Sequence, residues 1–302
     1  MSGQVAEFWD KNLKIRSKKT TRLSWLESPI ILHECLDLLP LEDRKVSVEQ
    51  WLSWFKEKYL TETVNLGLSL GAGDGTLERH AILLDMCHQM EAFDISPLSI
   101  QTAFDFNKEQ DLHHKINLEV ADLNTIVLEE NKYDVIFGSM IIHHIKNLEN
   151  LFTEIKRSLK PGGFLVVNEY IGPSQFQMTD EQIEPIEKIL DLLPDHLKRD
   201  IHSGDVRKFC PQPSIEYMNE NDPSEAVRSA EIVKIMEEKL QIIEKVDYGG
   251  TIMHQLLHGI IDNFDDHNQE HVSLIKLIRY LEEELISNKI IDNEFSVIVA
   301  TP

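Results

Sequence analysis

Cysteine is scarce in this sequence of 302 residues, which contains only Cys35, Cys87 and Cys210. The three lie far apart and are odd in number, so the sequence offers neither a disulfide framework nor a paired-cysteine metal motif. We therefore expect the protein to work in a reducing compartment, the cytoplasm.

Positive charge is also scarce, because 30 Lys and Arg residues stand against 52 Asp and Glu residues, a formal net charge of −22 at pH 7. Nucleic acid and anionic membrane surfaces repel such a chain, so neither is an expected partner. No apolar run approaches the roughly 18 residues of a membrane span, and the first residues lack the apolar centre of a signal peptide. These absences predict a soluble protein that is not exported.

The apolar residues between about residues 5 and 60 have a mostly helical spacing, which is interrupted near Pro29 and Pro40. We therefore predict an N-terminal helical extension over residues 1–62. It holds all four tryptophans, Trp9, Trp25, Trp51 and Trp54. Either these side chains dock helices onto a sheet, which we favour, or they form a wall of a ligand pocket.

Residues 63–171 have a different rhythm, in which short apolar runs alternate with amphipathic segments. This pattern is typical of βα units around a parallel sheet. The predicted strands are residues 64–70, 89–93, 116–120, 133–138 and 163–168, and the predicted helices are 76–85, 96–108 and 148–159. A turn at Pro161, Gly162 and Gly163 is expected to lead into the fifth strand.

The part of the chain after the fifth predicted strand divides into two segments. Residues 172–230 contain six prolines among short helical stretches, which predicts a helical lid inserted into the core. Strand-like runs return at 240–248 and 294–300, with helices at about 253–264 and 270–288. Residues 231–302 are therefore predicted to complete the sheet.

The first predicted strand runs directly into a glycine-rich turn, Leu70-Gly71-Ala72-Gly73-Asp74-Gly75. Glycines at 71 and 73 permit a tight turn and let a nucleotide-like ligand approach the backbone, beside the free N–H groups of the following helix. The dinucleotide pattern G-x-G-x-x-G needs its third glycine one residue later than Gly75, which disfavours a nicotinamide cofactor.

Two acidic residues follow the next predicted strands. Asp94 lies beyond Gly71 at close to the roughly 20 residues at which an acid grips ribose hydroxyls. Asp122 follows the third strand, where its carboxylate either accepts a hydrogen bond from an adenine amino group or caps a helix. The glycine turn and the two acids, in this order, favour a nucleoside-bearing cofactor.

These residues, with Tyr133-Asp134-Val135-Ile136 and Leu159-Lys160-Pro161-Gly162-Gly163, resemble the class I S-adenosylmethionine-dependent methyltransferases over about residues 66–170. The resemblance implies an α/β, Rossmann-like fold with a seven-stranded, mostly parallel sheet in the order 3-2-1-4-5-7-6, strand 7 antiparallel. It implies S-adenosylmethionine as cofactor, bound by Gly71, Ala72, Gly73, Asp94, Ile95, Asp122, Leu123 and Ser139. The insert around Asp222-Pro223-Ser224-Glu225-Ala226-Val227-Arg228-Ser229 also resembles uncharacterised bacterial members of the family, which identify no acceptor.

In an open α/β sheet the reactive groups lie just beyond the carboxyl ends of the strands. His143 and His144 follow the fourth predicted strand and Glu169 ends the fifth. One of the histidines, with His143 slightly preferred, is a candidate general base for an oxygen acceptor. Adjacent histidines on a helix start are expected to point in different directions, however, and one of them to make structural hydrogen bonds. Glu169 either orients the acceptor or the cofactor's ammonium group, or caps a neighbouring helix.

Three further residues are weaker candidates. His254 and His258 share a helix face, but no third ligand is evident and Gln255 stands where a metalloprotease would have Glu, so no metal site is expected. His254 is instead a reserve candidate for the acceptor pocket. Arg228 either binds an acidic substrate group or, as we favour, pairs with Glu225 on the surface.

The sequence thus predicts a methyltransferase that acts on a small molecule, with oxygen favoured over nitrogen or carbon as the methylated atom. A nicotinamide-dependent oxidoreductase and a catalytically inactive cofactor-binding scaffold are the alternatives. Residues 138–141 read Gly-Ser-Met-Ile, which differs from the Asn/Asp-Pro-Pro-Tyr/Phe motif of amino-group methylators. No motif specifies the acceptor or the oligomeric state.

Overall fold

The computed structural model describes residues 2–16, 22, 24–36 and 50–302 of the chain. Pro40 and most of the interruption predicted near it lie outside these residues, as does the side chain of Cys35. Cys87 and Cys210 are buried free thiols.

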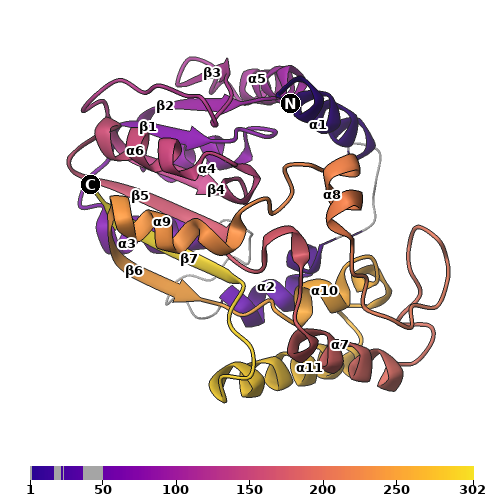
Figure 1. Cartoon of the computed structure of the whole chain (residues 1–302). Coiled ribbons are helices and arrows are strands. Elements are labelled where there is room, and N and C mark those ends of the chain that lie inside the picture. The colour runs from indigo at the N-terminus through magenta and orange to yellow at the C-terminus, as the bar shows by residue number, and fades with distance from the viewer. Residues whose placement is uncertain (1, 17–21, 23, 37–49) are drawn as a thin grey trace.

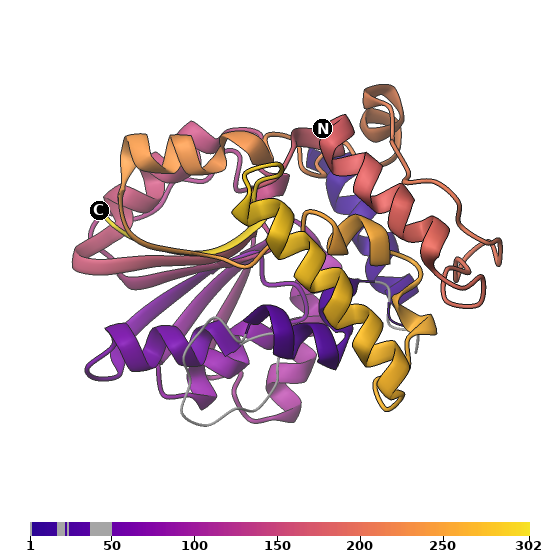
Figure 2. The same ribbon diagram turned by 90° about the horizontal axis from the view of Figure 1, so that it is seen from below.

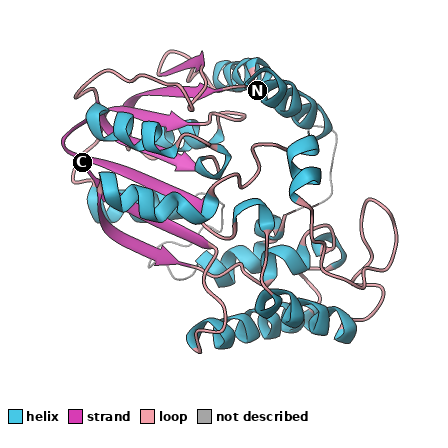
Figure 3. Cartoon of the chain, in the orientation of Figure 1, coloured by secondary structure: helices cyan, strands magenta, loops and turns pink. Residues whose placement is uncertain are grey.

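The core is a seven-stranded sheet with the order β3-β2-β1-β4-β5-β7-β6 (Figures 1 and 3). Its strands are β1 (Val64–Leu70), β2 (Cys87–Asp94), β3 (Ile116–Val120), β4 (Tyr133–Ser139), β5 (Leu159–Tyr170), β6 (Gln241–Asp247) and β7 (Phe295–Thr301). β7 runs antiparallel to both β5 and β6, and the pairs among β1 to β5 are parallel. The predicted fold class is therefore confirmed.

Helices cover both faces of the sheet and extend beyond it. They are α1 (Ser2–Arg16), α2 (Pro29–Leu36), α3 (Gln50–Tyr59), α4 (Thr76–Leu83), α5 (Pro97–Glu109), α6 (Leu148–Ser158), α7 (Asp180–Leu192), α8 (Ile215–Asn221), α9 (Ile232–Lys239), α10 (Met253–Leu257) and α11 (Gln269–Ser287). Short 3₁₀ turns are η1 (Trp25–Glu27), η2 (Ile142–His144), η3 (Ser174–Phe176), η4 (Ser229–Glu231) and η5 (Ile261–Asn263). Figure 2 shows α6 and α9 on one face of the sheet and α3 and α4 on the other.

Two predicted boundaries are wrong for local reasons. β5 begins at Leu159 rather than at residue 163, because the Pro-Gly-Gly segment forms a bulge within the strand instead of a turn before it. The helix predicted at 253–264 is divided into α10 and η5, because Gly259 lies between them with a φ of +71°.

Alternate residues of the central strands enter two different hydrophobic cores, as the two-residue period of a strand requires. On β4, Val135 and Phe137 pack into a cluster with α3 and α4, whereas Ile136 packs into a cluster with α6 and α9. Trp51 and Trp54 of α3 are fully buried in the first cluster. For these two tryptophans the docking interpretation is correct.

Helices from the two ends of the chain and from the insert gather beyond the carboxyl ends of the parallel strands (Figures 1 and 2). Residues of α2, α7, α10 and α11 belong to the same hydrophobic cluster as α3. This packing places the predicted N-terminal extension and the predicted lid around the edge at which the glycine turn and the candidate catalytic residues emerge. Among the described residues, no helix combines the length and apolar character that crossing a bilayer requires.

Glu294, just before β7, ties this region to the sheet and has an unusual environment. Its side chain is 2% exposed, and one carboxyl oxygen accepts a hydrogen bond from Gln182 Nε2 of α7 at 2.6 Å. The other oxygen has no hydrogen-bond partner. Burial, with a smaller contribution from the charge of Glu282, raises the pKa of Glu294 from 4.5 to about 8.

We expect Glu294→Gln to flatten the dependence of stability on pH. The folded protein keeps the Glu294 proton up to about pH 8, whereas the unfolded chain releases it near pH 4.5, so the free energy of unfolding falls as pH rises between these values. The fall is at most about 1.4 kcal/mol per pH unit. Urea unfolding at pH 5 and pH 8 should therefore show a larger gain for Glu294→Gln at pH 8. The control is Glu238→Gln on the exposed side of α9, which should not change the dependence of the free energy of unfolding on pH. If Glu294→Gln raises the free energy of unfolding equally at both pH values, the expectation is wrong.

Candidate active site

A large cavity opens at the carboxyl edge of the sheet, with a volume of about 1510 Å³. A site for one small ligand usually occupies about 300–1,000 Å³, so this cavity can hold two ligands side by side. Its walls come from the N-terminal helices, the loops that follow the strands, α5, the insert and α10.

The glycine turn forms one wall. Gly71 and Gly73 both line the cavity and have φ angles of +78° and +54°. A side chain at position 71 would collide with Ile141, since its Cβ atom would lie 2.6 Å from Ile141 Cγ1. Ala72 does not line the cavity, which corrects its expected contact with the cofactor. It is buried, and its N–H donates to the Phe93 carbonyl at 2.7 Å, which anchors the turn to β2.

Asp94 joins this turn to the end of β2. Its Oδ2 accepts from the Gly73 N–H at 2.9 Å and its Oδ1 accepts from the Ser96 N–H at 2.8 Å. Burial raises the pKa of Asp94, while these two N–H groups oppose the rise. A carboxylate has about four acceptor sites, so Asp94 can accept further hydrogen bonds from a ligand in the cavity.

The other predicted cofactor-binding residues also reach the cavity. Asp122 lines it, and its Oδ1 accepts from the backbone N–H of Asn124 at 2.9 Å. This hydrogen bond caps a turn and not the helix that was the alternative expectation, because the next helical element, η2, begins only at Ile142. Ile95, Leu123 and Ser139 lie on the same wall. The structure therefore brings together seven of the eight predicted residues, with Ala72 behind them.

Beyond β4, His143 and His144 face the same cavity. Their ring centroids are 4.1 Å apart, so the expectation that they point in different directions is wrong. Both residues belong to the 3₁₀ turn η2, and α6 begins only at Leu148.

Glu169 lies behind His143, is fully buried and does not line the cavity. Of the two alternatives for Glu169, its hydrogen bonds fit the capping of a neighbouring helix, here η2, and not a contact with the acceptor or an ammonium group. Its Oε2 accepts from the N–H groups of Ile141 at 3.0 Å and Ile142 at 2.6 Å. Its Oε1 is hydrogen bonded to His143 Nδ1 and to the Tyr170 N–H. Burial lowers the pKa of His143, but Glu169 outweighs burial with help from Glu225, and the pKa rises to about 9.

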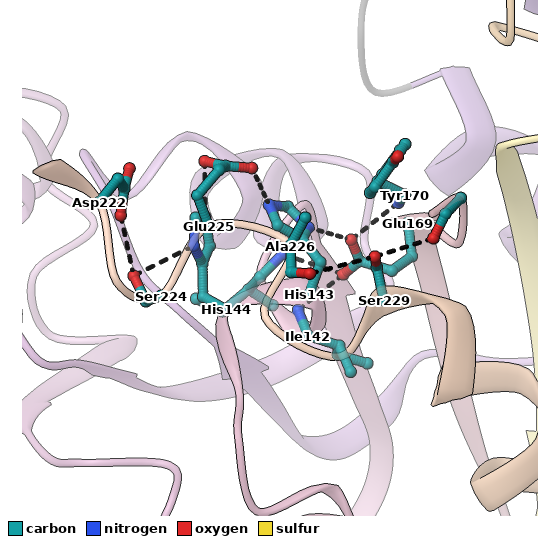
Figure 4. Close-up of polar contacts among 12 residues, drawn as sticks. Ile142, His143, His144, Glu169, Tyr170, Asp222, Ser224, Glu225, Ala226 and Ser229 are labelled. Atoms are coloured by element: carbon teal, nitrogen blue, oxygen red, sulfur yellow. Dashed lines mark hydrogen bonds and ion pairs between the residues drawn. The ribbon is translucent and has the colours of Figure 1, made fainter. Parts of the chain in front are cut away.

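The insert supplies an acidic group that the sequence interpretation missed. Glu225 lies over both histidines, with Oε1 3.6 Å from His143 Nε2 and Oε2 4.0 Å from His144 Nε2 (Figure 4). The Val227 N–H donates to the His143 carbonyl at 3.0 Å and holds the insert on η2. Arg228 does not pair with Glu225. It binds Glu149 at 2.8 Å and Glu231 at 2.7 Å, away from the cavity.

The local sequence around Glu225 gives only a weak signal for a cavity residue, because its neighbours in sequence form turns. Its position depends on the insert folding back onto η2, far away in the sequence. The acidic pair Asp222 and Glu225 in a proline-containing loop was the only available indication. Burial, and after it the charge of Glu225, raises the pKa of Asp222 to about 6.

The remaining wall is aromatic. Trp9 packs edge-on against His144, with ring centroids 5.0 Å apart, and Trp25 also lines the cavity. For Trp9 the pocket interpretation is therefore correct, whereas Trp25 is 1% exposed and also belongs to the hydrophobic cluster of α2 and α3, as the docking interpretation expects. His254 lies among Tyr170, Phe176 and Phe295 at centroid distances of 5.2–5.8 Å. Burial lowers the pKa of His254 to about 3, and its Nδ1 has no hydrogen-bond partner.

Comparisons with known proteins agree with this geometry. Residues 68–167 match the family model described as a methyltransferase domain. The hybrid PKS-NRPS synthetase apdA of Emericella nidulans is 34% identical over 113 residues, which are 35% of this chain and 3% of that protein. This chain thus spans only a small part of the curated relative that it matches.

Solved structures that resemble the whole chain in fold include a cyclase and a methyltransferase. The [4+2]-cyclase SpnF aligns with a TM-score of 0.57 and 12% identity over 100% of this chain and 96% of its own. The geranyl diphosphate C-methyltransferase of Streptomyces coelicolor A3(2), in complex with Mg²⁺, geranyl diphosphate and S-adenosylhomocysteine, aligns with a TM-score of 0.54 and 11% identity. That alignment covers 99% of this chain and 97% of the other. At such identities the likeness concerns the fold, and a cyclase and a methyltransferase share it.

Proposed function

Since the chain carries a class I S-adenosylmethionine-dependent methyltransferase domain at residues 68–167, we propose that it transfers a methyl group from S-adenosylmethionine to a small-molecule acceptor. The observation that carries this proposal is one continuous cavity. It joins the wall formed by Gly71, Gly73 and Asp94 to the wall formed by His143 and His144, and it has room for cofactor and acceptor together.

In this proposal the sheet side of the cavity holds the cofactor. The backbone at Gly71 and Gly73 lies against the methionine part, and Asp94 accepts hydrogen bonds from the two ribose hydroxyls. Asp122 meets the adenine amino group, while Ile95 and Leu123 contact the two faces of the base. Ser139 is proposed to lie beside the methionine part. Each of these side chains lines the cavity.

The acceptor is proposed to bind on the aromatic side, between Trp9, Tyr170 and His254. Methyl transfer is a displacement at carbon in which the sulfonium leaves as a neutral thioether, so the protein must align the acceptor and exclude water. The N-terminal helices and the insert enclose the reacting atoms from the side opposite the sheet.

We propose oxygen as the favoured methylated atom, because an alcohol or phenol needs a base that takes its proton. The neutral form of His143 is suited to this role, and because the pKa of His143 is raised to about 9, this form becomes the main one only above that pH. Glu169 fixes the ring through Nδ1 and stabilises the imidazolium that forms when Nε2 takes the proton. Glu169 is thus a positioning residue. Nitrogen and carbon acceptors remain compatible with the same cavity.

Calorimetry on the purified protein tests the cofactor assignment. We expect S-adenosylmethionine and S-adenosylhomocysteine to bind one molecule per chain with a dissociation constant in the micromolar range, and NAD⁺ and NADH to give no heat. Heat with the nicotinamide cofactors alone would instead favour the oxidoreductase. Release of S-adenosylhomocysteine should then be measured over a panel of small phenols, alcohols and amines. Binding without turnover over the whole panel would favour the inactive scaffold.

A further inference from the structure

His143, His144 and Glu225 converge on one point at the edge of the cavity (Figure 4). One nitrogen or oxygen atom from each lies within 4.8 Å of the others. The closest pairs, His143 Nε2 with Glu225 Oε1 at 3.6 Å and His144 Nε2 with Glu225 Oε2 at 4.0 Å, have the spacing of atoms that share a metal ion. Bonds of about 2.0–2.2 Å place neighbouring ligand atoms roughly 3–4 Å apart.

Both histidines are oriented from behind through their other ring nitrogen. His143 Nδ1 is hydrogen bonded to Glu169, and His144 Nδ1 lies 3.4 Å from Ser224 Oγ. These contacts leave the two Nε2 atoms directed at Glu225. A metal-binding histidine characteristically donates its second ring N–H to a carboxylate or other acceptor, which fixes the tautomer and raises the basicity of the ligand nitrogen.

Glu169, which lies behind His143, is itself held firmly in place. Glu169 accepts from three backbone N–H groups, those of Ile141, Ile142 and Tyr170, and is fully buried. It cannot turn toward the cavity without breaking these hydrogen bonds. Glu169 therefore holds the His143 ring in one orientation, as a ligand of a preformed site requires.

Charge is also consistent with a bound cation. In the cation-bound form both imidazoles are neutral ligands, so the cation takes the place of the His143 proton and balances the two carboxylates of Glu169 and Glu225. Two imidazole nitrogens and one carboxylate suit zinc, iron or cobalt better than magnesium or calcium, which prefer oxygen ligands alone. Three protein ligands beside an open cavity leave positions for an exogenous oxygen atom.

We propose that His143, His144 and Glu225 bind one divalent transition-metal cation of the zinc class, whose open coordination position receives the oxygen atom of the acceptor. This inference deepens the proposed function and rests on it for the reaction, although cation binding itself is measurable without turnover. In the cation-bound protein His143 is a ligand, and the cation lowers the pKa of the bound acceptor hydroxyl, whose proton leaves to water. The oxygen then bonds to the methyl carbon as the bond from that carbon to sulfur breaks and the neutral thioether leaves.

Titration with Co²⁺ tests the site, because bound cobalt has a visible absorption band that reports its coordination. A second group able to hold a metal, the exposed Asp111, His113 and His114, must first be removed. The test therefore uses the full chain with His113→Ala and His114→Ala, stripped with a chelator. We expect this background protein to bind one equivalent of Co²⁺, to release it to Zn²⁺, and to ignore a large excess of Mg²⁺.

Substitutions then assign the ligands in the same background. Glu225→Gln and His144→Gln should each weaken Co²⁺ binding at least about 100-fold, and Glu169→Gln should weaken it about 10- to 100-fold through the orientation of His143. Co²⁺ binding that is absent from the background protein, or undiminished by both ligand substitutions, would overturn the proposal.

Calorimetry with S-adenosylhomocysteine on the same proteins separates this proposal from the proposed function and checks folding. If the protein binds S-adenosylhomocysteine but not Co²⁺, the proposed metal site is wrong and the proposed methyltransferase function is unaffected. If the protein binds Co²⁺ but not S-adenosylhomocysteine, the metal site is supported and the proposed cofactor is wrong.

Discussion

Asp94→Ala is expected to weaken S-adenosylhomocysteine binding by at least about 100-fold. The proposed contacts are two hydrogen bonds from ribose hydroxyls to a carboxylate, and each hydrogen bond to a charged group contributes about 1.5–3 kcal/mol. The substitution also releases the Gly73 and Ser96 N–H groups that Asp94 now holds, so the glycine turn loses its anchor. Calorimetry measures the loss directly.

Two variants control for this effect. Asp94→Asn keeps the size of the side chain and one acceptor oxygen, so its loss of affinity should be smaller than that of Asp94→Ala. Asp105→Asn makes the same charge change on the exposed side of α5, outside the cavity, and should bind as the unsubstituted protein does. If folded Asp94→Ala binds S-adenosylhomocysteine within about threefold of the unsubstituted protein, the proposed cofactor position is wrong.

The second large effect is expected at His143. His143→Gln should lower kcat by about 100- to 10,000-fold, the usual contribution of a group that takes a proton in the transition state, with little change in S-adenosylhomocysteine affinity. Glu169→Gln should lower kcat in the same direction, because Glu169 orients that ring. The double variant should lose scarcely more activity than His143→Gln alone, since the two residues act as one unit. The measurement uses the acceptor from the panel that gives the fastest turnover.

His254→Gln is the matched control for His143→Gln. His254 lines the same cavity among aromatic rings, but among the described residues no carboxylate is hydrogen bonded to it. We expect a higher KM for the acceptor and a kcat within a few-fold of the unsubstituted protein. A folded His143→Gln variant that keeps kcat within about tenfold would show that neither a base nor a metal ligand is needed at this position.

The side of the cavity at which we propose that the cofactor binds was predictable, because each of its signals is local. A strand, a glycine turn and the start of a helix occupy consecutive residues, and the glycines at 71 and 73 adopt the positive φ angles that such a turn needs. Asp94 and Asp122 end successive strands, and strands paired in parallel present their carboxyl ends at one edge. Ala72 departs from the prediction because its side chain is buried in the turn.

The acceptor side was not predictable in the same way. Glu225 contributes a charge to the cavity only because the Val227 N–H binds the His143 carbonyl, a contact between segments far apart in the chain. Trp9 and Trp51 both lie in segments whose apolar residues have helical spacing, so the sequence does not distinguish them. Yet Trp9 lines the cavity and Trp51 is buried against the sheet.

The sequence by itself determined the parallel core, the strand order through its family resemblance, and the positions of the glycine turn and its two acids. These features are encoded in runs of a few consecutive residues. Their strand periodicity and turn residues specify local structure without contacts to distant parts of the chain. Only the tertiary structure decided that Glu169 stands behind His143, that Glu225 stands before it, and which tryptophans face the cavity. Those relations depend on how helices from both ends of the chain and the insert pack over the sheet, and side-chain packing between distant segments leaves no periodic trace in the sequence.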